Sequence, residues 1–201
     1  TQDPEQFQPG QLLFTASRIE NEAPELAQQL RDAVTNAAPD SIEVLEARLN
    51  SLMRSGELQD AERLVQAALA NADDENRAVL ELLRLRVANV ADPAAARGLM
   101  EAMLEAPSIT TRELNIALSM NSVWADDELA GRLIERLREM TGEDSPGWRI
   151  YEGQRLVQQD DPSEADLVRT LQLVRDVLAL EPANVQARVI ASRAYEISQE
   201  P

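Results

Sequence analysis

The chain has 201 residues, 44% of them hydrophobic and only 3% aromatic, and its 19 basic residues, all arginine, stand against 36 acidic ones for a net charge of −17. This length accommodates one or two domains, and so negative a surface repels nucleic acid and anionic lipid, which excludes both as expected partners. The chain holds no cysteine and no histidine, which excludes disulfides, zinc sites built from thiolate or imidazole ligands, cysteine nucleophiles and histidine bases.

The N-terminus carries no recognisable targeting signal. The chain begins with Thr1 and has no signal-like apolar segment, which indicates either a trimmed or a mature fragment. Residues 1–9 are polar, contain two prolines and predict a disordered lead or linker. No run of about 18 apolar residues occurs, so no direct membrane insertion is expected. The localisation stays open between a soluble periplasmic and a soluble cytoplasmic protein.

Apolar residues recur at helical spacing from residue 10 onwards, and no segment alternates as a strand would. Thr110 with Glu113 forms a capping-box pattern, and Asp40 with Glu43 and also Asp161 mark further expected helix starts. The predicted helices are 10–22, 24–37, 41–54, 57–71, 76–90, 93–105, 110–123, 126–140, 146–159, 163–180 and 183–198.

An internal repeat runs through these helices, because three columns of residues recur at a spacing of 34. The columns are Ala27, Ala61 and Ala95; Val34, Ala68 and Ala102; and Pro39, Asp73 and Pro107. The next unit continues with Ala130, Ile134 and Leu137, displaced by one residue. About seven residues are inserted near position 160, and we expect them to lengthen both helices of their unit.

These columns resemble those of the tetratricopeptide repeat (TPR), a hairpin of two antiparallel helices with small residues in its second helix and a closing proline. Ala95, Leu99, Ala102 and Pro107 match that pattern. The segment LEPANVQARVIASRAYEIS is the most typical piece, with Tyr195 at an aromatic position of the repeat.

The TPR resemblance covers about residues 24–198 and implies an all-α fold. The implied architecture is a right-handed superhelix of about five helical hairpins over residues 10–198, the last one incomplete. One amphipathic hairpin cannot bury its apolar face alone, whereas stacked hairpins bury a continuous seam. Small side chains such as Ala61 and Ala95 would let paired helices approach closely.

The resemblance also implies a binding site, because the first helix of each TPR hairpin lines a concave groove. The positions carried over are Asn50, Arg54, Arg77, Arg84, Arg112, Asn115, Ser119 and Arg149, together with Glu43, Glu46, Leu80, Ala88, Ser122, Gly153, Gln186 and Arg193. The arginines predict an acidic or C-terminal peptide as ligand, bound by bidentate contacts around Arg84. The alternative is that they pair with neighbours such as Glu81 and Glu113 on a solvated helix face.

Catalysis is not expected from this sequence. The acidic clusters Asp73-Asp74-Glu75, Asp126-Asp127-Glu128 and Asp160-Asp161 fall at helix starts, where carboxylates cap free N–H groups. A core role is expected for Trp148, Tyr151, Met100, Met103 and Met120. No Gly-rich phosphate loop or serine nucleophile elbow is present, so we expect no enzyme, no cofactor and no metal.

The sequence therefore predicts a scaffold that binds a protein or peptide in a concave groove. One alternative is self-assembly through the ends of the solenoid, and another is an enzyme with a carboxylate-only site. The segment 183–198 favours self-association, because its apolar residues occupy more than one side of the helix. These residues are Val185, Val189, Ile190, Ala194 and Ile197. We expect Ile190→Glu or Ile197→Glu to weaken a homodimer formed through this helix.

Overall fold

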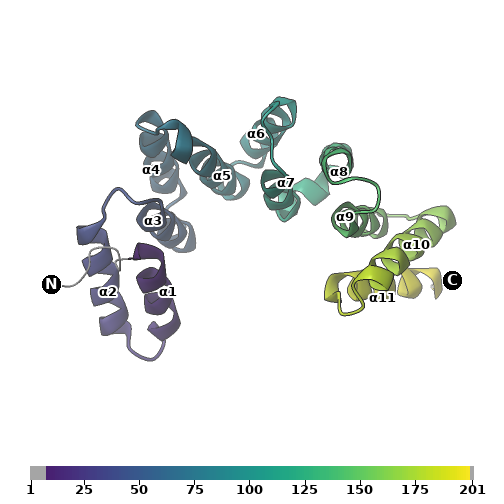
Figure 1. The fold of residues 1–201 in the computed structure, drawn as a ribbon, viewed down its shortest axis with the longest axis horizontal. Helices are drawn as coiled ribbons and strands as arrows, with labels where there is room; N and C mark the ends of the chain where they lie inside the picture. Colours follow the sequence, from purple (N-terminus) through teal and green to yellow (C-terminus); the bar gives the residue numbers. More distant parts are fainter. Residues whose placement is uncertain (1–7, 200–201) are drawn as a thin grey trace. The chain divides into compact units, whose positions relative to one another are not determined.

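The structure is a computed structural model that describes residues 8–199, and every regular element among these residues is a helix (Figure 1). The predicted all-α fold is therefore confirmed. The helices are α1 (Pro9–Ile19), α2 (Pro24–Ala37), α3 (Ile42–Ser55), α4 (Leu58–Ala70), α5 (Asp74–Ala91), α6 (Pro93–Glu105), α7 (Thr111–Leu118), the 3-10 helix η2 (Asn121–Ala125), α8 (Asp127–Thr141), α9 (Pro146–Val157), α10 (Glu164–Leu180) and α11 (Val185–Gln199). Residues 1–7 of the predicted lead lie outside the described residues, and α1 already begins at Pro9.

The chain divides into two compact units, residues 1–93 and residues 94–201. In the first unit α1 packs against α2, α3 against α4, and α4 against α5. In addition α1 contacts α3, and α3 contacts α5, so these three helices lie side by side. That adjacency creates a surface formed mainly by α1, α3 and α5.

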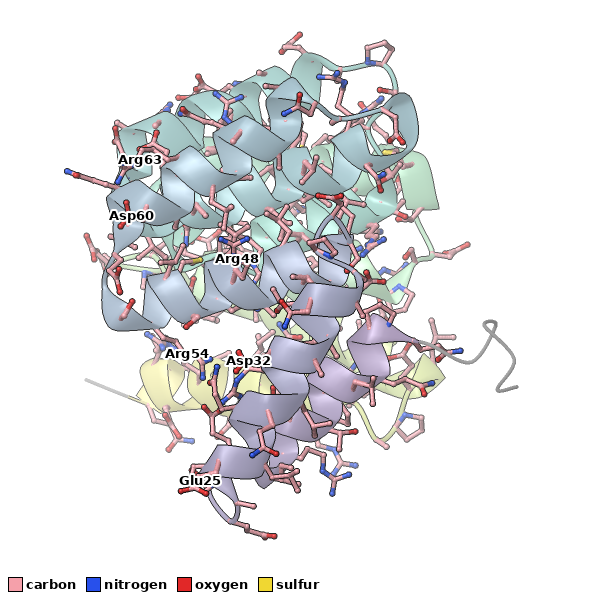
Figure 2. The ribbon with its side chains drawn as sticks, turned by 90° about the vertical axis from the view of Figure 1, so that its left-hand side faces the viewer. Glu25, Asp32, Arg48, Arg54, Asp60 and Arg63 are labelled. Carbon is pink, nitrogen blue, oxygen red and sulfur yellow. The ribbon has the colours of Figure 1, made fainter. Side chains whose placement is uncertain are left out.

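The core of the first unit lies where α3, α4 and α5 meet. Ala61 and Val65 of α4 are fully buried against Leu49 of α3 and Leu83 of α5. An alanine at the closest contact lets the helix backbones approach, and the larger side chains fill the space around it. On the outside of α4, Arg63 and Asp60 form an exposed ion pair (Figure 2).

The second unit has a core of the same kind between α9, α10 and α11. Val174 and Val177 of α10 pack with Ile190 and Ala194 of α11, and Ala187 is also fully buried. The helix α9 contacts both α10 and α11, and α8 packs against α7 and α9. Each of these helices thus buries its apolar stripe against its neighbours.

The repeat frame predicted around α6 is wrong by one residue. Ala95 and Ala102 are exposed, whereas Ala96 is fully buried and Met100 is 1% exposed. Ala96 lies 34 residues before the buried Ala130, so the displacement predicted between residues 95 and 130 occurs before α6 rather than after it. The loop between α5 and α6 is a single residue, Asp92, because α5 extends for 18 residues.

Two predicted helices differ in length from the observed ones. The predicted helix 110–123 ends as α7 at Leu118 and continues as η2, with Ser119 and Met120 between them. The insertion near residue 160 does not lengthen α9, which has 12 residues, but enters the following loop while α10 reaches 17 residues. Helix α7 therefore offers fewer side chains to any binding surface than the sequence predicted.

Several helices begin with capping residues, as predicted, but at two helices the capping residue differs from the predicted one. The capping box of Thr110 and Glu113 is present, and Gly56 ends α3 in the left-handed region at φ 80°. Ser41 rather than Asp40 caps α3, and Ser163 rather than Asp161 caps α10. In both cases the hydroxyl accepts from a backbone N–H three residues on, which only the residue directly before the helix can do.

The five aromatic and methionine side chains that the sequence predicted for the core are all shielded from solvent to some degree. Trp148, Met100 and Met120 are buried, while Met103 and Tyr151 are half-buried. Tyr195, at an aromatic position of the predicted repeat, is by contrast 55% exposed on α11, because Ala191 and Ala194 face the neighbouring helices instead.

Candidate functional site

A groove of about 840 Å³ runs over α1, α3 and the last turn of α5 in the first unit. It lies on the surface created by the contacts of α1 with α3 and of α3 with α5. Its lining includes Leu13, Phe14, Glu20, Arg31, Glu43, Glu46, Ala47, Asn50, Met53, Arg54 and Val90. A hollow of comparable size, about 830 Å³, lies along α10 in the second unit.

Apolar side chains stand open to solvent in this groove. Phe14 on α1 is 64% exposed and Val90 on α5 is 51% exposed, whereas most large apolar side chains of the unit are shielded from solvent. Exposed apolar residues gathered in a concave surface with a polar rim are typical of a protein or peptide interface.

Ion pairs hold the polar side chains of the groove in place. Arg86 of α5 donates to Oε1 of Glu46 at 2.7 Å and to Oδ1 of Asn50 at 2.9 Å, joining α5 to α3. On the other side of the groove, Glu20 lies 3.3 Å from Arg31 and 4.0 Å from Arg54. These two carboxylates are thereby neutralised by neighbouring arginines, which leaves the groove with little net charge around them.

The four groove positions predicted in the first full repeat all line this groove. Glu43, Glu46, Asn50 and Arg54 lie on α3 at spacings of three and four residues, which places them on one face of the helix. Arg54 also donates from Nε to the carbonyl oxygen of Asn50 at 3.3 Å, and its side chain stays 70% exposed (Figure 2).

On α5 the predicted positions do not lie at the groove. Helical geometry turns Arg77 and Arg84 by about 140° and 120° around the helix from Val90. Arg77 donates to the carbonyl oxygen of Ala72, and Arg84 pairs with Glu81 at 3.4 Å, as the alternative interpretation of these arginines predicted. Both arginine side chains remain exposed.

Two further groove positions predicted on α5, Leu80 and Ala88, are also not exposed in the groove. Leu80 is 3% exposed and belongs to the core rather than to a binding surface, and Ala88 is half-buried. Arg86, which sequence reasoning missed, is the α5 residue that reaches the groove side chains. It lies 36 residues after Asn50, so a strict spacing of 34 assigned Arg84 to that position instead.

In the second unit, most of the predicted polar residues of α7 bond to their own helix. Asn115 donates to the carbonyl oxygen of Thr111 at 2.7 Å, and Ser119 donates to that of Ile116 at 2.6 Å. Arg112 is exposed, and Ser122 is half-buried in η2. Asn115 keeps its side-chain oxygen as an acceptor, so a ligand contact there would not require these bonds to break.

Arg149 is the predicted groove residue most deeply engaged within the protein. Its side chain is 15% exposed, donates to the carbonyl oxygen of Glu143 at 2.9 Å and lies 3.5 Å from Asp144. Its guanidinium also stacks over Trp148. A ligand would have to displace these contacts, so Arg149 serves here to fix the start of α9.

Gly153 and Gln186 show how closely the helices of the second unit approach. Gly153 is buried, and a Cβ built on it would lie 3.5 Å from Ile190 and 3.6 Å from Val174. The prediction that Gly153 is exposed in a groove is therefore wrong. Gln186 donates to Gln154 across the contact of α11 with α9, and Arg193 is exposed on α11.

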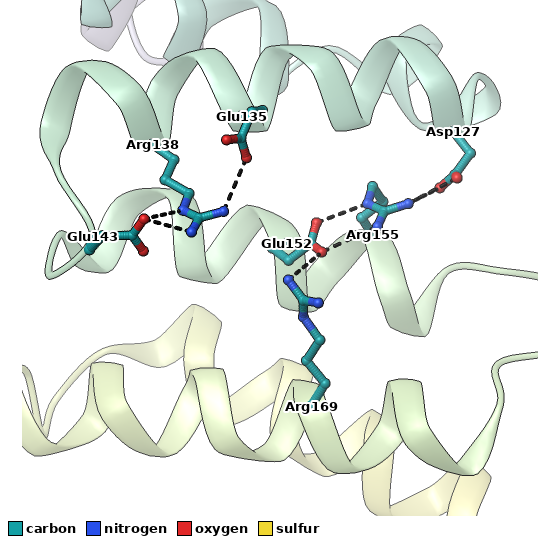
Figure 3. Close-up of polar contacts among 7 residues, drawn as sticks. All are labelled: Asp127, Glu135, Arg138, Glu143, Glu152, Arg155 and Arg169. Atoms are coloured by element: carbon teal, nitrogen blue, oxygen red, sulfur yellow. Dashed lines mark hydrogen bonds and ion pairs between the residues drawn. The ribbon is translucent and has the colours of Figure 1, made fainter.

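A chain of ion pairs crosses three helices of the second unit (Figure 3). Arg155 of α9 pairs with Asp127 of α8 at 2.8 Å and with Glu152 at 2.9 Å, and Glu152 in turn lies 3.4 Å from Arg169 of α10. The hydrogen bonds from Arg155, first to Glu152 and then to Asp127, raise the pKa of Arg155 above its usual value. Because Glu152 is 8% exposed and needs these partners, the chain of ion pairs is a structural element.

The acidic clusters act at helix starts where the structure describes them. Asp73 accepts from the N–H of Asn76, and Asp126 accepts from that of Leu129. Among residues 8–199 with described side chains, no three acidic groups gather closely enough to hold a metal ion. Within that range no helix is both long and apolar enough to cross a membrane.

Comparison with models of protein families, with curated proteins and with solved structures gave no match to this chain. The function is therefore inferred from the residues and their geometry.

Proposed function

We propose that this chain is a binding scaffold that holds a segment of another protein in the groove of α1, α3 and α5. The single observation that carries the proposal is the 840 Å³ groove with Phe14 and Val90 exposed inside it. Rigid helices supply the walls, and the pairs of Arg86 with Glu46 and Asn50 fix the polar side chains before a ligand arrives.

The arrangement of helices supports a TPR-like solenoid as the architecture behind this groove. In the first unit α3 contacts both α1 and α5, and in the second α9 contacts α11 in the same way. The buried alanines Ala27, Ala61, Ala96 and Ala130 recur at spacings of 34 and 35 residues. A repeat of this kind exposes the first helices on one surface, which is where the groove lies.

The groove favours a ligand with apolar side chains and modest charge. Phe14 and Val90 would gain by removal from water, and Glu20 and Glu46 already have arginine partners. Binding at this site should therefore depend weakly on salt, because little of its free energy comes from unpaired charges.

A displayed library of random peptides, selected against the whole chain, tests the proposal. The selected peptides should bind Phe14→Glu and Val90→Glu at least about tenfold more weakly than the natural chain, a change of about 1.4 kcal/mol. Leu26→Glu is the matched control, because Leu26 is 51% exposed on α2 and does not line the groove. Equal affinities for all variants would contradict the groove as the binding site.

An acidic or C-terminal peptide bound by Arg77 and Arg84 is the second candidate. The observation that favours it is the exposure of both guanidinium groups on one side of α5. Binding there should weaken with added salt and with Arg84→Glu, and it should be indifferent to Phe14→Glu. The two surfaces are thus distinguished by one set of variants.

A further inference from the structure

Helix α11 buries one face and exposes the opposite one. Ala187, Ile190 and Ala194 are buried against α9 and α10, whereas Val185 is 72% exposed and Val189 is 61% exposed. Ile190 therefore cannot be part of an open apolar strip, and Ile190→Glu would test core stability rather than association. The exposed strip consists of Val185, Val189 and their neighbours on the outer face.

The outer face of α11 has the spacing of a helix–helix contact. Val185, Val189, Ser192 and Glu196 follow one another at steps of four, three and four residues, so they form a single stripe along the helix. Ser192, at the middle of this stripe, is small enough to allow another helix to approach closely. Arg188 and Tyr195 flank the stripe on one side, and both are exposed.

The charged and apolar residues of this stripe, together with the two residues that flank it, can match those of a second α11 helix. Suppose that two α11 helices cross antiparallel at Ser192. The residue three positions before Ser192 in one copy then meets the residue three positions after Ser192 in the other, which places Val189 against Tyr195 of the other copy. The residues four positions away also meet, which places Arg188 against Glu196. A two-fold axis produces each contact twice.

We propose that the outer face of α11 binds a second copy of this chain in an antiparallel pair centred on Ser192. The paired charges select this orientation, because a parallel arrangement would place Arg188 against Arg188 and Glu196 against Glu196. The contact can extend onto α10, because Val168 of α10, 60% exposed, and Tyr195 of α11, 55% exposed, line a shared hollow of about 830 Å³. This pairing uses a different surface from the groove and does not depend on it.

The test measures self-association of the whole chain by sedimentation at about 0.15 M salt, where the net repulsion between acidic molecules is screened beyond about 8 Å. The natural chain should dimerise, and Val189→Glu should weaken the dimer at least about tenfold. Leu26→Glu introduces the same charge at an exposed apolar residue of α2 and should leave the dimer unchanged. Because Val189 and Leu26 are both exposed, circular dichroism should show intact helices for each variant.

Charge reversal tests the antiparallel register. Arg188→Glu alone and Glu196→Arg alone should each weaken the homodimer, since like charges then face one another twice. Mixing these two single variants should restore association, because both contacts between positions 188 and 196 then join a glutamate to an arginine. A chain that stays monomeric at about 1 mM overturns the proposal. So does a dimer that ignores Val189→Glu, or a mixture that fails to recover.

Discussion

Arg86 reaches from α5 to Glu46 on α3, with 2.7 Å between its Nη1 and Oε1 of the carboxylate, across 40 residues of sequence. Because the same guanidinium also donates to Asn50, one side chain links two helices beneath the groove. We expect Arg86→Met to lower the free energy of unfolding by about 0.5–1.5 kcal/mol, a range that allows for the partial exposure of the pair.

Arg63→Met is the matched control for Arg86→Met. Arg63 pairs with Asp60 on the exposed side of α4, three residues away on the same helix. Removing that pair should cost about 0.5 kcal/mol or less. Chemical denaturation measures both changes in the free energy of unfolding. Equal decreases for the two variants would show that the link from Arg86 to α3 stabilises the fold no more than an exposed ion pair does.

Alanines at the closest helix contacts should not tolerate a larger side chain. Ala61 and Ala96 are fully buried, so Ala61→Leu and Ala96→Leu should each destabilise the fold by about 1–3 kcal/mol. Ala95→Leu, one residue from Ala96 but exposed, should change stability by less than about 0.5 kcal/mol. If thermal melting shows that Ala95→Leu rather than Ala96→Leu destabilises the protein, the frame with a strict spacing of 34 is correct and this account is contradicted.

Gly153 separates the effect of helix propensity from that of packing. A methyl group there meets Ile190 and Val174 at ordinary contact distance, so Gly153→Ala should stabilise the protein by about 0.5–1 kcal/mol. Gly153→Leu should instead destabilise it by about 1–3 kcal/mol, because the larger side chain has no space. Gly131, with nothing within 4 Å of an added Cβ, should accept both substitutions in a thermal melt that measures all four variants.

The start of α10 should make stability depend on acid pH. The hydrogen bond from the Ser163 hydroxyl, followed by that from its backbone N–H, lowers the pKa of Asp166 below its usual value. The ionised carboxylate therefore stabilises the fold above the unfolded pKa, and this stability is lost as the pH falls below about 4. Ser163→Ala should lower the melting temperature by a few degrees at pH 7 and by less at pH 3. A difference that stays constant over that range would contradict this assignment.

The sequence predicted the helices well because their apolar periodicity and their caps are local features. The starts at Thr110 and Pro146, for example, depend only on residues within one turn. The face of α3 that lines the groove could also be predicted from the sequence. Its residues Glu43, Glu46, Asn50 and Arg54 share one side of the helix at regular spacing.

The predictions that failed depend on contacts between helices. The extra length of α5 and the one-residue loop at Asp92 displace the repeat after α5, so Ala96 replaces Ala95 in the core. Within α5, Arg86 rather than Arg84 faces α3 and reaches Glu46 and Asn50. Phe14 and Val90 look like ordinary core residues in the sequence, and only the packing of α1, α3 and α5 leaves them exposed.

Photo-crosslinking of a selected peptide to the whole chain, with the linked residues located by mass spectrometry, tests the central claim most directly. We expect links to α1 near Phe14, to α3 between Ala47 and Arg54, and to the last turn of α5 near Val90. These links should be lost with Val90→Glu and kept with Leu26→Glu. Links concentrated on α10 and α11, or spread evenly over the chain, would contradict the groove as the binding site.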